Sequence, residues 1–224
     1  MLTVLIQSLV LAAGGMLSVG SITIVILLLL SDRGWQNGLA YVLGYVGAYS
    51  LIGTVVVWVG FSVAENGSSE SGNVSSILLI IMGLLLLWLT QRNWRKPPPE
   101  NKNSESPRLF ALVDKMTPPK AFGFGALVTV INFKNLAIFL SAVSVPLLSN
   151  LSLPAKIMVA LLDALVFCTA VIVPVLIYVA FPKQANERLN WIKQTLERYG
   201  RPIGIGVPLL FGLIFLIRGI TGLL

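Results

Sequence analysis

The 224-residue chain contains no histidine and only one cysteine, Cys168. Without histidine and with one thiol, the chain alone cannot build a Cys/His metal site or a disulfide framework. A thiol-redox carrier is excluded for the same reason, since two cysteines are needed to cycle a disulfide. No P-loop signature for nucleotide phosphates occurs, which argues against ATPase machinery. We therefore expect no metal and no cofactor.

Charged residues are also scarce, at 11% of the chain, whereas 56% are hydrophobic. A bilayer of about 30 Å is crossed by about 20 apolar residues, and the backbone groups of such a segment must be satisfied internally, as in a helix. The first run has no basic segment before it, so we expect it to stay as a helix and not to be a cleaved signal peptide. The prediction is an all-α integral membrane protein with six transmembrane helices, at residues 4–30, 36–61, 74–90, 121–148, 154–181 and 203–223.

Basic residues are distributed unevenly between the connections. Loops 31–35, 91–120 and 182–202 hold thirteen Lys and Arg, whereas 62–73 and 149–153 hold none. Because basic loops stay in the cytoplasm, this bias predicts a multi-pass protein of the cytoplasmic (inner) membrane with both termini outside. The net charge of +7 then reflects contact with anionic lipid, and we expect no nucleic-acid partner.

Two surface segments follow from polarity and spacing. Residues 91–120 begin as a polar linker too hydrophilic to bury a core. The linker ends in apolar positions three apart, which predicts a short interfacial helix, with Phe110, Val113 and Met116. A second amphipathic helix is predicted at 184–200, where Leu189, Ile192, Leu196 and Tyr199 recur at three and four. Its simplest role is support at the membrane surface.

A weak internal repeat relates the two halves. "MLSVGSITIVILLLLS" (16–31) lies over "VINFKNLAIFLSAVS" (130–144), and Gly83 in the third span lies over Gly212 in the sixth. Since each half has three spans, the second copy enters the membrane from the opposite side. This favours a 3+3 inverted repeat, 1–90 and 121–224 joined by the linker, although chance similarity between leucine-rich helices is an alternative.

Spans one and four are longer than a bilayer requires, because about 27 residues of helix reach ~40 Å. Each carries a polar or small cluster at mid-length, "SVGS" and "NFKN". Such residues tolerate non-helical backbone, so we predict that helices 1 and 4 are broken or kinked there. Broken helices that meet at the midplane hold substrate and coupling ions in secondary transporters. We expect the two clusters to surround one cavity.

Two ionisable residues lie inside spans. An intramembrane lysine costs about 2.5–3.5 kcal/mol, so Lys134 should face a polar cavity or a partner, and Asp163 is the only acidic residue within a span. The two could form a static salt bridge, or they could bind a substrate anion or carry a coupling proton. The predicted substrate or coupling-ion site comprises Ser18, Ser21, Asn132, Lys134, Asn135 and Asp163.

"LSVGSITIVILLLLSDRGWQNGLAYVLGY" and "DKMTPPKAFGFGALVTVINFKNLAIFLSA" resemble the peptidoglycolipid-addressing (GAP) proteins, a branch of the lysine-exporter (LysE) superfamily. The similarity covers nearly the whole chain and is most specific at 114–135. Members usually carry proline where this chain has Val19 and Phe133. The resemblance implies a six-helix inverted-repeat transporter. Some relatives are linked to export of lipid-linked or other envelope molecules, and other branches export amino acids or metal ions.

These features predict a secondary exporter of a small amphipathic or lipid-linked envelope molecule, with membrane lipids as partners. An exporter of amino acids or other metabolites, and a non-transporting assembly factor for envelope lipids, stay as alternatives. An intramembrane enzyme would need Lys134 to act as a base for a nearby Ser or Thr, since histidine is missing, and we predict no enzymatic activity. Assembly into a homo-oligomer stays open.

Overall fold

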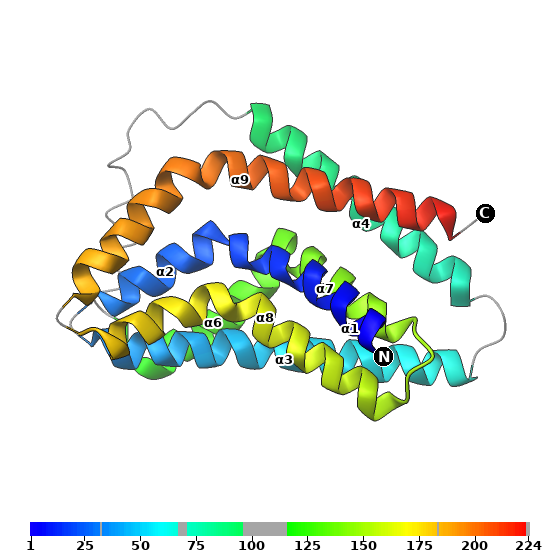
Figure 1. The fold of residues 1–224 in the computed structure, drawn as a ribbon, viewed down its shortest axis with the longest axis horizontal. Helices are drawn as coiled ribbons and strands as arrows, with labels where there is room; N and C mark the ends of the chain where they lie inside the picture. Colours follow the sequence, from blue (N-terminus) through cyan, green and yellow to red (C-terminus); the bar gives the residue numbers. More distant parts are fainter. Residues whose placement is uncertain (32, 67–70, 96–115, 183, 223–224) are drawn as a thin grey trace.

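The computed structural model describes residues 1–31, 33–66, 71–95, 116–182 and 184–222. Every element in these ranges is a helix, and Figure 1 shows the helices running alongside one another in an elongated bundle. In chain order they are α1 (Leu2–Ala12), the 3-10 helix η1 (Ala13–Leu17), α2 (Val19–Leu29), α3 (Gly34–Asn66), α4 (Ser71–Arg95), α6 (Pro118–Ile131), α7 (Phe133–Leu147), α8 (Leu153–Ala180) and α9 (Ala185–Thr221).

Two described helices are each long and apolar enough to cross a membrane, α8 and the Gly34–Ser62 part of α3. Two further candidates are bent pairs, α1 with α2 at 62° and α6 with α7 at 76°. Counting each pair as one span gives up to four candidates among the described residues. The chain is therefore a helical membrane protein, as predicted, while the six-span repeat stays a prediction.

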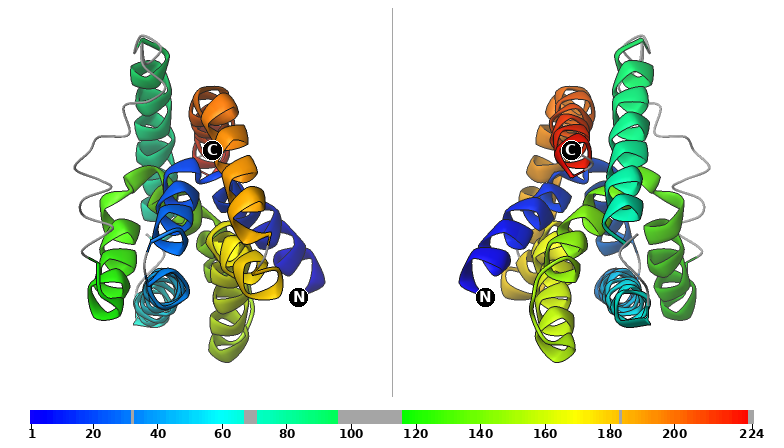
Figure 2. Two further views of the ribbon diagram at one scale, coloured as in Figure 1. Left: turned by 90° about the vertical axis from the view of Figure 1, so that its left-hand side faces the viewer. Right: turned by 90° about the vertical axis from the view of Figure 1, so that its right-hand side faces the viewer.

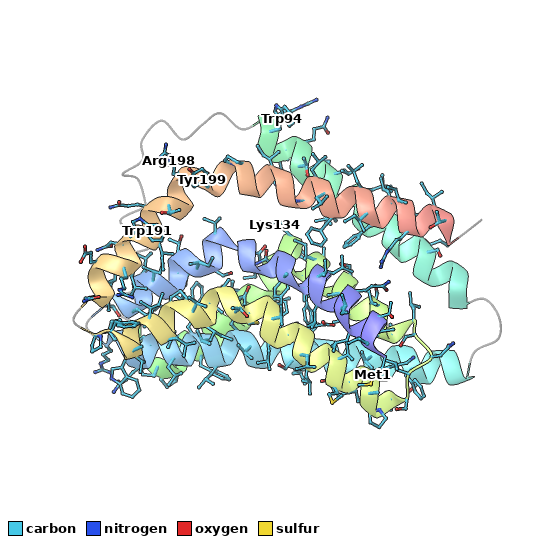
Figure 3. The ribbon with its side chains drawn as sticks, in the orientation of Figure 1. Met1, Trp94, Lys134, Trp191, Arg198 and Tyr199 are labelled. Carbon is cyan, nitrogen blue, oxygen red and sulfur yellow. The ribbon has the colours of Figure 1, made fainter. Side chains whose placement is uncertain are left out.

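The C-terminal region corrects one sequence expectation. The amphipathic helix predicted at 184–200 and the span predicted at 203–223 form one continuous helix, α9, with Pro202 inside it. A proline removes one backbone hydrogen bond and bends a helix without always ending it. Figures 1 and 3 show the bend in α9 close to Arg198 and Tyr199, just before this proline. The sequence pattern predicts both parts of α9 correctly as helix, but it places a boundary between them.

The linker region is described only at its ends. Helix α4 continues to Arg95, beyond the predicted span end at residue 90. Most of the predicted interfacial helix, with Phe110 and Val113, lies outside the described residues. Its last position, Met116, is half-buried, and its carbonyl oxygen accepts a hydrogen bond of 3.1 Å from Asn37 Nδ2. This bond ties the start of α6 to the first turn of α3.

A column of aromatic rings forms the centre of the bundle. Tyr41, Tyr45 and Tyr49 are fully buried one turn apart on α3, with ring centroids 5.9 and 5.0 Å apart. Tyr49 continues the column to Phe139 of α7 at 4.8 Å and Phe167 of α8 at 4.7 Å. Offset and edge-to-face rings at such distances add to the stability of a packed core. The column therefore connects α3 to both a broken helix and a continuous one.

Glycines allow two helix pairs to approach closely. A Cβ on Gly44 of α3 would collide with the carbonyl of Phe122 in α6, and one on Gly125 of α6 with the carbonyl of Tyr41. In the second pair, a Cβ on Gly83 of α4 would lie 2.9 Å from the carbonyl oxygen of Gly212 in α9. Small residues at such contacts are typical of membrane helices. Figure 2 shows α4 and α9 together on one side of the bundle.

The α2–α3, α7–α8 and α8–α9 connections lie at the two ends of the bundle. In Figure 1 the N-terminus, the C-terminal end of α9 and the α7–α8 connection lie toward the right. The α2–α3 and α8–α9 connections lie at the left. This arrangement follows the alternation expected from the distribution of basic residues.

Candidate functional site

Both predicted breaks are present, and their backbones have nearly the same conformation. Ser18 separates η1 from α2 with φ −82° and ψ 76°, and Asn132 separates α6 from α7 with φ −82° and ψ 73°. This conformation lies far from the helical region and interrupts the hydrogen-bond ladder. The Asn132 side chain then caps α7, since its Oδ1 accepts a 3.3 Å hydrogen bond from the Asn135 amide. The polar clusters thus begin new helices without a proline at either break.

Hydrogen bonds join the two breaks directly. Asn135 Nδ2 donates to Ser18 Oγ, and Ser18 Oγ donates to Ser21 Oγ at 3.1 Å. Tyr45 of α3 completes the network, because its hydroxyl accepts a hydrogen bond from Ser21 at 3.3 Å and one from Asn135 at 3.4 Å. We call Ser18, Ser21, Tyr45 and Asn135 the crossing network, and the place where they meet the crossing. All four side chains are buried. Three of the predicted site residues, Ser18, Ser21 and Asn135, therefore meet at the crossing. The bond between Ser18 and Asn135 joins residues that are 117 positions apart in the chain.

The charge environment of the crossing is positive. Helices α2 and α7 both begin there, so both bring the positive ends of their dipoles and first-turn amides that lack helical acceptors. Lys134, in the first turn of α7, is half-buried and forms no hydrogen bond or ion pair with a described residue. Figure 3 shows Lys134 near mid-length of the bundle, far from the end that carries Trp191. This combination favours an anionic group.

Asp163 lies elsewhere in the bundle interior. Its side chain on α8 is fully buried, and neither carboxyl oxygen has a hydrogen-bond partner in the described part of the chain. The Ser8 hydroxyl of α1 faces the carboxyl, but it donates its own 3.0 Å hydrogen bond to the Leu5 carbonyl. No ion pair joins Asp163 to Lys134. The static salt bridge, one of the alternatives that the sequence left open, is not formed in this structure.

The crossing is closed in the structure. Ser18, Ser21 and Asn135 are buried and fill the contact between the helices, whereas Asn132 and Lys134 are half-buried. The expectation of one cavity bordered by all five residues stays a prediction.

Sequence reasoning missed Tyr45, the residue that connects the crossing to α3. Its neighbours on the helix face, Tyr41 and Tyr49, have buried hydroxyls without a described hydrogen-bond partner. Their four-residue spacing within an apolar span was the available signal, since three tyrosines at i, i+4 and i+8 share one face.

Two broken helices that meet through buried polar side chains define the chain as a helical membrane protein with a polar site between its two helix breaks. The sequence matches the profile of the family described as "Sap, sulfolipid-1-addressing protein" over residues 9–221, and the chain belongs to this family. No curated protein and no solved structure matches it. The family is consistent with the lipid-addressing resemblance seen in the sequence, whereas a LysE relationship is not shown.

Proposed function

We propose that the chain is a secondary transporter that moves an envelope lipid with an anionic group across the cytoplasmic membrane, and that it has no enzymatic activity. The crossing is the substrate site, with Asn135, Ser18 and Ser21 as polar contacts and Lys134 as the charged element. Asn132 positions the start of α7. The membership of the sulfolipid-1-addressing family supports a role in handling envelope lipids.

The observation that carries this proposal is the joining of two helix breaks by a buried polar network, next in sequence to a lysine that has no hydrogen-bond or ion-pair partner among the described residues. Half-helix N-termini at mid-membrane bind the anionic groups of substrates in transporters with broken helices. Lys134 has no carboxylate partner among the described residues and adds to that field, and because a charge within a span is costly, its presence there favours a functional role. A sulfate or phosphate ester is the type of group that this arrangement would stabilise.

The 3+3 inverted repeat and the LysE relationship belong to the same proposal. Support comes from the equal backbone conformations at Ser18 and Asn132 and from the contact of Gly83 with Gly212, the glycines that the repeat aligns. For α2 and α7 the exchange of the halves also preserves neighbours, since α2 contacts α3 and α8 while α7 contacts α8 and α3. We place both termini outside, as the basic loops require.

Asp163 acts as a separate coupling group in this proposal. Because it does not pair with Lys134, neither charge is needed to neutralise the other in this conformation. A buried carboxyl in a span must bind a proton, a cation or a donor, and Ser8 of α1 is its neighbour. Binding of a proton or a cation at Asp163 would therefore depend on the position of α1.

A non-transporting assembly factor is the second candidate, favoured by the closed packing of the crossing. Purified protein in proteoliposomes separates the two functions. The transporter should accelerate the movement of a fluorescent sulfated glycolipid from one leaflet to the other, relative to protein-free vesicles. A folded protein that moves neither this lipid nor phosphatidylglycerol would support the assembly factor.

A further inference from the structure

A hollow of about 850 Å³ lies where α8 turns into α9, far from the crossing. We call it the elbow hollow. The described residues of its lining carry a guanidinium, a carboxylate, an indole, amides and apolar side chains, and include Ile177, Gln184, Glu187, Arg188, Trp191 and Gln194. No residue of the crossing network takes part in it. Figure 3 shows Trp191 at this end of the molecule.

Arg188 is held in place at the hollow by two contacts. Its guanidinium lies 4.2 Å from the centroid of the Phe181 ring, and its Nη2 donates a 2.8 Å hydrogen bond to Gln184 Oε1. An arginine has five N–H donors in a fixed fork, so several stay free for phosphate or sulfate oxygens. Fixing the side chain in advance reduces the entropy lost on binding. Glu187 borders the same hollow and opposes an anion there.

The position of the hollow at the end of the apolar span α8 indicates headgroup depth. The apolar span α8 ends at Ala180, and the hollow extends from Ile177, inside the span, to Gln194 on α9. Trp191, which is 67% exposed, is a residue type that favours the membrane–water interface. Val173, one turn from Ile177 toward the membrane interior, and Leu176 are exposed and apolar. Acyl chains can follow these two residues while a headgroup occupies the hollow.

We propose that the elbow hollow binds the anionic headgroup of a lipid in the adjacent cytoplasmic leaflet, with Arg188 contacting its phosphate or sulfate ester and Trp191 covering the glycerol or sugar. The role as a loading site for transport rests on the proposed function, whereas the binding itself does not. The crossing would receive the lipid later, after the closed network opens.

The test uses the full-length protein in nanodiscs of phosphatidylcholine with increasing phosphatidylglycerol that carries bromines near the glycerol end of its chains. The signal is the quenching of Trp191, taken as the difference between the wild type and Trp191→Phe. Arg188→Gln should raise the half-saturating fraction of phosphatidylglycerol about three- to tenfold, the effect of losing one charge-assisted contact at a partly exposed site. A sulfated glycolipid should compete with the brominated lipid, and this competition should also need Arg188.

Two variants serve as controls. Arg198→Gln removes an exposed arginine of the same helix that lies 5.7 Å from the Tyr199 ring and does not line the hollow, so it should bind like the wild type. Glu187→Gln should tighten binding, an effect that misfolding cannot imitate.

Three results would overturn the site: equal losses in Arg188→Gln and Arg198→Gln, equal quenching by brominated phosphatidylcholine, or displacement of the lipid by inorganic sulfate at matched ionic strength. Binding is measured without leaflet transfer, so a negative result removes the loading site and leaves the transport proposal to its own test.

Discussion

At the scale of single residues, the crossing depends on a few short polar side chains in an apolar bundle. Ser18 and Asn135 belong to different halves of the chain and meet through one hydrogen bond. Both are buried, so removal of either partner leaves the other without a replacement from water. Tyr45 then connects the pair to a continuous helix. The position of the two breaks relative to each other therefore depends on these contacts.

The first prediction is an energetic coupling between Ser18 and Asn135. Ser18→Ala and Asn135→Ala should each lower the free energy of unfolding by about 1–3 kcal/mol, with an interaction energy of about 0.5–3 kcal/mol in the double mutant. Thermal unfolding in detergent measures both. Ser144→Ala is the control, because this hydroxyl donates only within α7, to the Ser141 carbonyl, and its effect should add to that of Asn135→Ala. Simple additivity for Ser18 and Asn135 would mean that their bond does not join the halves.

At the scale of elements, the sequence predicted the breaks but not the continuity of the last helix. Excess length and polar clusters located the interruptions at Ser18 and Asn132, since a long apolar run with mid-length Asn or Ser has few other solutions in lipid. The continuity of α9 through Pro202 could not be predicted, because a proline either ends or bends a helix according to what packs around it. The sequence also could not show whether Lys134 has a partner, since depth in the membrane does not fix the direction in which a side chain points.

The second prediction concerns the contact between α3 and α6. Gly44→Ala and Gly125→Ala place a methyl group against the backbone of the opposite helix, which cannot move aside as a side chain can. Each should lower the free energy of unfolding by about 1–3 kcal/mol. Gly47→Ala and Gly123→Ala, on the same helices, meet nothing within 4 Å and should be neutral or stabilising.

Comparison of the four midpoints of unfolding tests this contact. Equal behaviour of the buried and open positions would show that the two helices do not touch through these glycines in the membrane protein.

At the scale of the whole molecule, the arrangement of connections and the distribution of basic residues agree on two opposite ends. The α7–α8 connection lies at the end that carries the N-terminus, and the α8–α9 connection lies at the other (Figure 1). The distribution of Lys and Arg residues predicts the orientation of these ends. The fold shows that the two ends lie apart, whereas the sequence alone implies this only through the number of spans.

The third prediction tests this orientation with single cysteines in a Cys168→Ala background, where the native thiol is buried. Asn150→Cys, exposed in the α7–α8 connection, should react with an impermeant maleimide in intact cells. Gln184→Cys, exposed at the start of α9, should react only after the membrane is permeabilised. Labelling of both sites in intact cells, or the reverse order, would contradict the proposed topology.

The most direct test of the central claim is leaflet transfer of a sulfated glycolipid by the Lys134→Met variant in proteoliposomes. Lys134 has no partner among the described residues, and loss of its charge should slow transfer at least about tenfold, equivalent to 1.4 kcal/mol. The variant itself should fold and insert normally. Lys134→Arg keeps the charge and should keep most of the activity. Wild-type transfer rates in a well-folded Lys134→Met protein would contradict the account and place the substrate away from the crossing.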